Sequence, residues 1–187
     1  RTGGTRTVRG GGEGMVGRES VTGGGGTVAV TAEGDAIKST KEEAAMGDIA
    51  IAGGAVNLDA RSDGIQGVGT VRITGGDLKI ISGGGSGNSA LYTDERPFGM
   101  GDEAETNADA SDDADAVSMK GVKAAVGISI SGGTLSVDAA DDAIHTDGSI
   151  VISGGKFTLA SGDDGIHADE QLTIEDCELL EIAKSYE

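Results

Sequence analysis

Two pairs of adjacent aspartates are the residues of this chain best suited to chemistry. Asp141 and Asp142 recur 22 residues later as Asp163 and Asp164, and each pair precedes an Ile-His dipeptide. Carboxylate oxygens are preferred ligands of Ca²⁺, and carboxylates stacked about 5 Å apart repel one another until a cation neutralises them. The pairs therefore predict a calcium site, whereas any one aspartate at such a turn is also explained by its hydrogen bonds to backbone N–H groups.

Further aspartates fall into register with these pairs. Asp63 stacks with Asp142 and Asp164 when the chain is aligned on its repeat, with Asp35 one repeat earlier, and a third acidic row follows the histidines. Open, flexible turns suit the irregular coordination of calcium better than the octahedral coordination of magnesium. The predicted metal ligands are Asp141, Asp142, Asp163 and Asp164 in the pairs, Asp63 in the same row, and Asp147 and Asp169 in the third row.

A row of polar side chains lies beside the acids. His145 and His167 stack at the 22-residue period, with Lys38, Gln66 and Lys123 in the same row. Zinc usually needs a third histidine or a cysteine, and the single cysteine falls elsewhere in the repeat, so zinc is not predicted. The row either binds sugar hydroxyls and carboxylates or is ordinary surface polarity. The predicted carbohydrate-binding residues are His145, His167, Lys120, Lys123, Gln66 and Tyr92.

A repeat of 22 residues positions all of these side chains. Residues 131–152 read SGGTLSVDAADDAIHTDGSIVI, and residues 153–174 read SGGKFTLASGDDGIHADEQLTI. Short alternating runs of apolar and polar residues predict two or three strands in each repeat, and no segment has the length of a helix. Stacked repeats of this kind predict an all-β fold, a right-handed parallel β-helix with about 22 residues per coil. The expected interior ladders are Ile130, Ile152 and Ile174, and Val122, Ile144 and Ile166.

Two segments fall outside this period. Residues 1–26 are Gly-rich with four arginines, and we expect a flexible lead, a cap or a partner-binding arm ahead of a β-helix domain over 27–187. The spacing from Ile65 to Val122 exceeds 22 by 35, which predicts a long insertion loop at 83–117 that is either a solvated loop or a flap beside the binding face. A smaller excess of six residues places a short loop near 39–47.

The composition limits the function. The net charge is −18 and aromatic residues are 2% of the chain. Such a charge disfavours nucleic acid and anionic membranes and suits divalent cations. One cysteine excludes an intrachain disulfide, and no stretch is apolar over the length of a membrane span. The sequence therefore predicts no nucleic-acid partner and no membrane span.

The repeated units resemble a family of bacterial carbohydrate-binding domains. Residues 131–174, with Lys120 and Lys123 upstream and residues 184–187 (KSYE) at the end, match its recurring D-D-[AG]-I-H and S-G-G-[TK]-F segments and the start of its K-S-Y-E-G-I segment. The resemblance covers about residues 27–187. It implies a secreted or cell-surface β-helix, similar to pectate lyases, that holds calcium and binds cellulose or acidic sugars. By this resemblance the calcium ligands lie among Asp141, Asp142, Asp147, Asp163, Asp164 and Asp169.

Three functions fit these observations. The first is non-catalytic, calcium-dependent binding of a polysaccharide such as cellulose or polygalacturonate. Sugar-stacking platforms normally use Trp or Tyr, and of these the chain has only Tyr92 and Tyr186. The second is a structural subunit whose open ends stack into a homo-oligomer or an end-to-end filament. The third is a pectate-lyase-like polysaccharide lyase in which calcium acidifies the proton beside a uronate carboxylate and Lys120 or Lys123 is the base.

Overall fold

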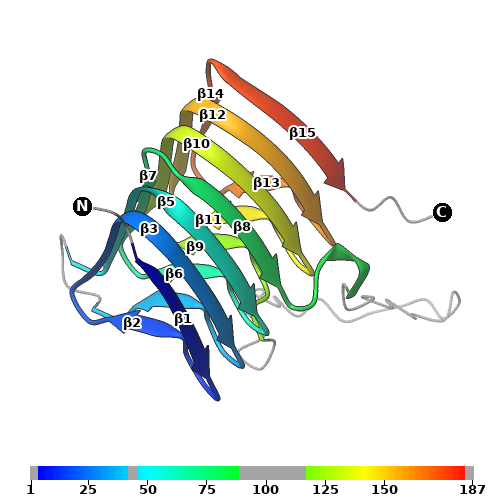
Figure 1. Cartoon of the computed structure of the whole chain (residues 1–187). Coiled ribbons are helices and arrows are strands. Elements are labelled where there is room, and N and C mark those ends of the chain that lie inside the picture. Colours follow the sequence, from blue (N-terminus) through cyan, green and yellow to red (C-terminus); the bar gives the residue numbers. More distant parts are fainter. Residues whose placement is uncertain (1–3, 42–45, 89–116, 184–187) are drawn as a thin grey trace, which may run out of the picture.

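The computed structural model describes residues 4–41, 46–88 and 117–183. These residues form two sheets in which all strand pairs are parallel, and the helical content among them is one 3-10 turn, η1 (Ser86–Asn88) (Figure 1). The fold is therefore all-β, as the alternating pattern predicts. No helix in the described part of the chain is long and apolar enough to cross a membrane.

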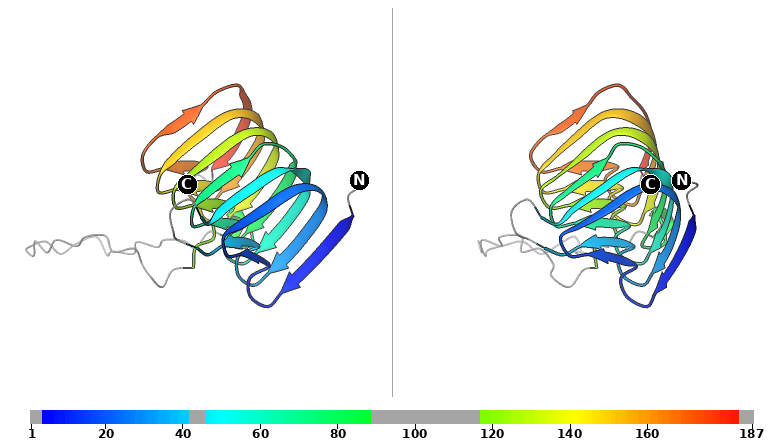
Figure 2. Two further views of the ribbon diagram at one scale, coloured as in Figure 1. Left: turned by 90° about the vertical axis from the view of Figure 1, so that its left-hand side faces the viewer. Right: turned by 60° about the vertical axis from the view of Figure 1, so that its left-hand side comes forward.

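The larger sheet has nine strands and the smaller sheet has six. The chain passes through both sheets repeatedly, and each passage lies next to the previous one (Figure 2). The larger sheet contains β1 (Thr5–Gly10), β3 (Ser20–Ala32), β5 (Asp48–Ala60), β7 (Thr70–Ile73), β8 (Asp77–Ser82), β10 (Gly127–Ala139), β12 (Ser149–Ser161), β14 (Leu172–Ile174) and β15 (Cys177–Ala183). The smaller sheet contains β2 (Met15–Gly17), β4 (Ile37–Ser39), β6 (Ile65–Gly67), β9 (Val122–Ala124), β11 (Ile144–Thr146) and β13 (Ile166–Ala168).

The strand register follows the sequence period. Ile130 pairs with Ile152, which is 22 residues later, and Val122 pairs with Ile144 at the same spacing. Ile65 pairs with Val122 across the long insertion. The predicted alignment across the insertion is therefore confirmed, although residues 89–116 lie outside the described part of the chain.

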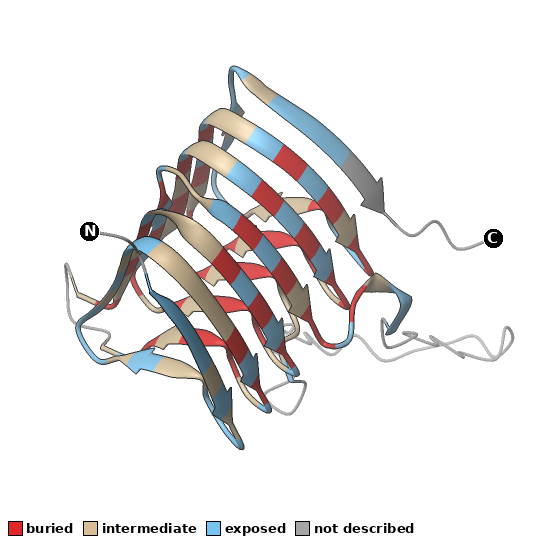
Figure 3. Ribbon diagram, in the orientation of Figure 1, coloured by how far each residue is buried: buried red, intermediate tan, exposed pale blue. Residues whose placement is uncertain are grey.

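A thin aliphatic core lies between the sheets. Buried and exposed residues alternate along the long strands (Figure 3), because successive side chains of a strand point to opposite faces. Leu135 pairs in register with Phe157, and both are fully buried. Ile174 continues the ladder of Ile130 and Ile152 but is 42% exposed, because β14 has no strand on its outer side among the described residues.

Paired glycines interrupt the long strands. The pairing of β10 with β12 shifts register between Ser131 and Thr134, where Gly133 has φ +98°. A Cβ atom there would lie 2.8 Å from the carbonyl oxygen of Gly76, so both the conformation and the close stacking need glycine. The recurring Gly-Gly pairs are thus the points where each long strand changes register.

The sheets begin earlier than the sequence predicts. Thr5 of β1 pairs with Thr27, and Met15 of β2 pairs with Ile37, both at the 22-residue spacing. The expected boundary at residue 27 falls inside β3, so residues 5–26 belong to the stacked sheets. The period was hidden there because the outermost strand needs few apolar residues, and the exposed Arg6 occupies the row of Val28.

Candidate functional site

Carboxylates at the turns before the short strands form a hydrogen-bonded ladder. Glu13 Oε2 accepts the backbone N–H of Asp35 at 2.6 Å, and Asp35 Oδ1 accepts that of Asp63 at 2.9 Å. Asp63 Oδ1 in turn accepts the N–H of Lys120 at 2.8 Å. Each acid therefore satisfies a backbone donor of the next strand row, which is the structural role expected of aspartate at a turn. Glu13 was not among the predicted residues, although it precedes Asp35 by one period.

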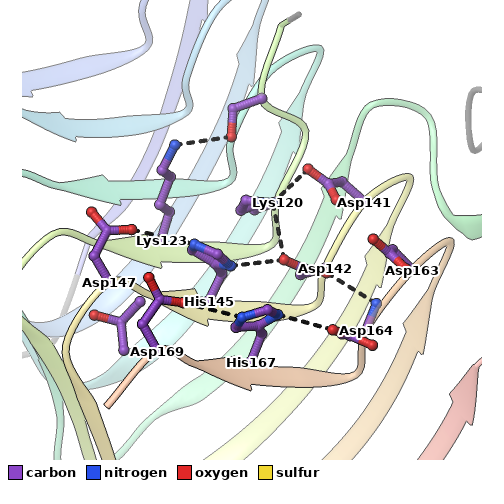
Figure 4. Close-up of polar contacts among 12 residues, drawn as sticks. Lys120, Lys123, Asp141, Asp142, His145, Asp147, Asp163, Asp164, His167 and Asp169 are labelled. Atoms are coloured by element: carbon purple, nitrogen blue, oxygen red, sulfur yellow. Dashed lines mark hydrogen bonds and ion pairs between the residues drawn. The ribbon is translucent and has the colours of Figure 1, made fainter. Parts of the chain in front are cut away.

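Lys120 interrupts the acidic ladder. It occupies the position between Asp63 and Asp142, because the unit that contains Val122 lies between the units of these two aspartates. The ladder resumes at Asp142, whose Oδ1 accepts the N–H of Asp164 at 2.9 Å. The Lys120 ammonium donates to Asp141 Oδ2 at 2.7 Å and to Asp142 Oδ2 at 2.9 Å (Figure 4).

Ion pairing sets the protonation states of this cluster. Burial disfavours the charges of Lys120 and Asp142, but their hydrogen bonds outweigh it. The pKa of Lys120 is therefore raised, and the bonds from His145 and Lys120 lower the pKa of Asp142 to about 2. Asp163 shows the opposite effect: partial burial and the charges of Asp142, Asp164 and Asp141 raise its pKa.

Asp141, Asp142 and Asp163 converge. One carboxylate oxygen of each lies within 4.8 Å of the others. Their chemistry fits a hard divalent cation, because carboxylate oxygens are calcium ligands. Burial and, after it, the negative charges of the neighbouring aspartates raise the pKa of Asp163. The Lys120 ammonium already neutralises part of that charge, so a cation would share Asp141 and Asp142 with it.

His145 lies between two acidic rows. Its Nδ1 is 2.8 Å from Asp142 Oδ2, and its Nε2 is 3.4 Å from Asp147 Oδ1. Figure 4 shows Asp147 and Asp169 on the opposite side of the histidine rings from Asp142 and Asp164. The histidine row therefore separates the third acidic row, which contains Asp147 and Asp169, from the other two.

His167 repeats this arrangement on the next strand. Its Nδ1 is 2.9 Å from Asp164 Oδ2, its Nε2 is 3.1 Å from Asp169 Oδ1, and its ring centroid is 5.0 Å from that of His145. The hydrogen bond to Asp164 is the largest influence on His167 and raises its pKa. Both histidines thus have each ring nitrogen directed at a carboxylate.

The remaining predicted residues lie farther along the rows. Gln66 pairs in register with Lys38 and Lys123, and the Lys123 ammonium is 3.4 Å from the Ser118 hydroxyl. Asp63 Oδ2 and Gln66 Oε1 are buried and have no hydrogen-bond partner within the described ranges. Tyr92 lies outside the described residues.

One surface hollow in the described part of the chain lies away from the acidic rows. An open depression of about 600 Å³ lies where β12 and β15 pair, lined by residues that include Gly155, Lys156 and Glu178. The histidine and aspartate rows instead run along the short-strand sheet. A ligand bound to the histidine and aspartate rows would therefore lie along an extended strip of that sheet.

Comparison with known proteins identifies a family. A family model described as carbohydrate-binding domain-containing protein matches residues 2–165, from β1 to the end of β12. That range contains Asp141, Asp142 and Asp163. No curated protein and no solved structure matches the chain significantly. The chain belongs to the family of carbohydrate-binding domain-containing proteins.

Proposed function

We propose that this protein binds an acidic polysaccharide without cleaving it, and that calcium held by the aspartate cluster bridges to the sugar carboxylates. The observation that carries the proposal is the convergence of Asp141, Asp142 and Asp163 beside a row of polar side chains. Family membership supports carbohydrate binding. The calcium, the acidic substrate and a secreted or cell-surface location are parts of the proposal.

We further propose that the two sheets are faces of a right-handed parallel β-helix. Parallel pairing at the 22-residue spacing in both sheets supports one continuous winding of the chain. Crossovers between parallel strands of one sheet are right-handed in nearly all proteins. In such a fold the site residues repeat along the axis, so the strip can follow the repeating sugars of a chain.

The cluster suits calcium bridging. Asp141, Asp142 and Asp163 would hold the ion, which would supply a positive charge for a uronate carboxylate. Lys120 keeps Asp141 and Asp142 in place through its two hydrogen bonds. Farther along the strip, Lys123 makes only a long contact of 3.4 Å with Ser118 among its described hydrogen bonds, so its ammonium is suited to a second carboxylate.

Removal of calcium tests this function. We expect affinity for polygalacturonate, measured by isothermal titration calorimetry, to fall at least about tenfold in EDTA and to return with added Ca²⁺. Asp163→Asn should show a similar loss, because it removes one ligand. The control Asp59→Asn makes the same charge change at an exposed position on β5 and should bind normally.

The outcomes separate the parts of the proposal. Binding that is unchanged in EDTA would contradict the calcium bridge. Binding to cellulose but not to polygalacturonate would contradict the acidic substrate. Absence of binding to either polymer would contradict the function itself.

The geometry weighs against Lys120 as the base of a lyase. A general base must be able to give up its proton near neutral pH. Lys120 instead donates to two carboxylates that raise its pKa, which stabilises the ammonium. Formation of unsaturated products from pectate, followed by ultraviolet absorbance, would show that another residue acts as the base.

A structural role is the second candidate. The last strands, β14 and β15, carry a group of exposed aliphatic side chains, which are Leu172, Ile174, Leu179 and Leu180. A further strand row, from a second copy or from additional chain, would bury Leu172, Ile174 and Leu179, which continue buried rows of β12. If copies stack end to end, light scattering should show mass rising with concentration, and Leu179→Asp should prevent it. A constant monomer mass for the unchanged protein would exclude this assembly.

A further inference from the structure

The stacked histidines, which the calcium proposal does not use, form a second cluster that shares Asp142 with the calcium site. His145 on β11 and His167 on β13 are paired in register, and their rings are tilted by 43° with centroids 5.0 Å apart. One ligand atom from each of His145, His167 and Asp142 lies within 4.8 Å of the other two. Asp164 Oδ2 is 2.9 Å from His167 Nδ1 and adds a fourth donor.

We propose that His145, His167, Asp142 and Asp164 bind a divalent transition-metal ion of the zinc type. Two imidazole nitrogens with two carboxylate oxygens make a four-ligand set that suits zinc, whereas calcium prefers oxygen ligands alone. The site requires no third histidine, because carboxylates of the ladder complete the set. Zinc was not predicted from the sequence, which could not show that both rings turn toward these acids.

The hydrogen-bond partners of the two imidazole rings favour Nδ1 as the metal-ligating nitrogen of each histidine. The Nδ1 atoms of His145 and His167 face Asp142 and Asp164, and these atoms would ligate the ion. The Nε2 atoms face Asp147 and Asp169, at 3.4 and 3.1 Å, and would donate their protons to them. A carboxylate that accepts from the outer nitrogen of a metal-bound histidine is a common feature of zinc sites, because it fixes the ring orientation.

The size of the cluster requires only side-chain adjustment. Tetrahedral ligands with bonds of about 2.0 to 2.2 Å lie roughly 3.4 Å apart. The two histidine–aspartate pairs, at 2.8 and 2.9 Å, would open by about 0.5 Å. The other donors of His145, His167 and Asp142, which lie within 4.8 Å of one another, would close by at most about 1.4 Å. The strands carrying the histidines are fixed at the ordinary parallel spacing, so χ rotations of the side chains supply this movement.

The charge balance supports an added cation. Four carboxylates, Asp142, Asp147, Asp164 and Asp169, surround the two rings, and Lys120 supplies one positive charge through Asp142. With both imidazoles neutral, a divalent ion would reduce the summed negative charge of these groups without reversing its sign. His167 and Asp164 are partly exposed, which gives the ion access from solvent.

Zinc titration tests the proposal. Chelator-treated protein at about pH 8, where unperturbed imidazoles are neutral, is titrated with Zn²⁺ by calorimetry in excess Ca²⁺, and Co²⁺ is followed by its absorption spectrum. We expect one ion per chain and an intense tetrahedral Co²⁺ spectrum. His145→Gln and His167→Gln should each weaken Zn²⁺ binding at least about tenfold.

Matched variants keep the result interpretable. Asp163→Asn and Asp59→Asn should retain Zn²⁺ affinity, and thermal unfolding followed by circular dichroism should show that the histidine variants are folded. Zn²⁺ binding that survives both histidine substitutions, or is lost equally in Asp59→Asn, would overturn the proposal, as would absence of binding. The assay contains no polysaccharide, so its result is independent of the proposed carbohydrate binding.

Discussion

Asp142→Ala is expected to lower the free energy of unfolding by about 3 kcal/mol, because it breaks a buried ion pair. The Asp142 side chain is 4% exposed and that of Lys120 is 13% exposed. Loss of the carboxylate leaves the Lys120 ammonium with Asp141 alone and removes the acceptor of the Asp164 N–H. Asp142→Asn keeps an oxygen for that N–H and should lose less. Urea denaturation of the three proteins measures the difference.

This loss should depend on pH in a defined direction. The pKa of Asp142 falls from 3.8 to about 2 in the folded state, so the folded protein binds this proton more weakly than the unfolded chain. Its ionised form therefore stabilises the fold above about pH 4, by about 1 to 2 kcal/mol after allowance for solvent screening. That contribution is lost as the pH falls through 2. The stability gap between the unchanged protein and Asp142→Ala should narrow over this range.

Asp63→Asn provides the control, because its environment has the opposite effect. Burial raises the pKa of Asp63, and Oδ1 accepts from Ser118 and from the Lys120 N–H. Asparagine keeps this acceptor and removes a disfavoured charge, so the variant should be at least as stable as the unchanged protein at pH 7. Equal losses in Asp63→Asn and Asp142→Ala would contradict the assignment of the stabilisation to the ion pair.

The sequence predicted the strand register well because the core constrains it. A slip of one residue would turn Ile144 or Ile65 out of the core, so the apolar rows define the alignment even across the long insertion. The constraint weakens at the first strands. Val8 is only half-buried and Arg6 is exposed, so the pattern there resembles a flexible lead although the strands pair at the same period.

The candidate site was predicted less completely, because it depends on side-chain directions. The period places His145 and Asp142 in neighbouring rows, but it cannot show that Nδ1 faces Asp142 while Nε2 faces Asp147. Lys120 was predicted as a sugar-binding residue or a base, but its ion pairs with Asp141 and Asp142, at an acidic position of the repeat, were not predicted. Which residues share a row follows from the backbone period, whereas which of their side-chain atoms face one another depends on the rotamers.

The residue just before each short strand varies with a core side chain of the same repeat unit. Gly121 lies in register with Ala143, and both precede a short strand. A Cβ on Gly121 would lie 2.2 Å from Val137 Cγ1. At the same register position as Val137, the unit of Ala143 carries Leu159. Thus the unit with glycine before its short strand carries a β-branched core residue, whereas the unit with alanine there carries leucine.

The pairing recurs in the earlier units. Ala36 occupies the position of Ala143 in a unit that carries Leu58 at the position of Leu159. In two other units that position is a glycine, and a Cβ atom built on it would lie 2.3 Å from a β-branched side chain. These pairs are Gly14 with Val30 and Gly64 with Ile80. A β-branched side chain carries a second methyl group on Cβ, which takes the space of the missing Cβ, whereas leucine branches one atom farther out.

Gly121→Ala is therefore expected to destabilise the protein by about 3 kcal/mol through overpacking. Val137→Leu introduced with it should restore at least about 1 kcal/mol, because the pair then reproduces Ala143 with Leu159. Recovery should be incomplete, since the new Cβ also lies 2.5 Å from the Ala143 carbonyl oxygen. Urea denaturation of both single variants and the double variant gives the coupling energy. Gly53→Ala is the control, because a Cβ there meets nothing closer than 3.9 Å. Additive losses in the double variant would show that backbone crowding, and not the branched side chain, requires glycine at this position.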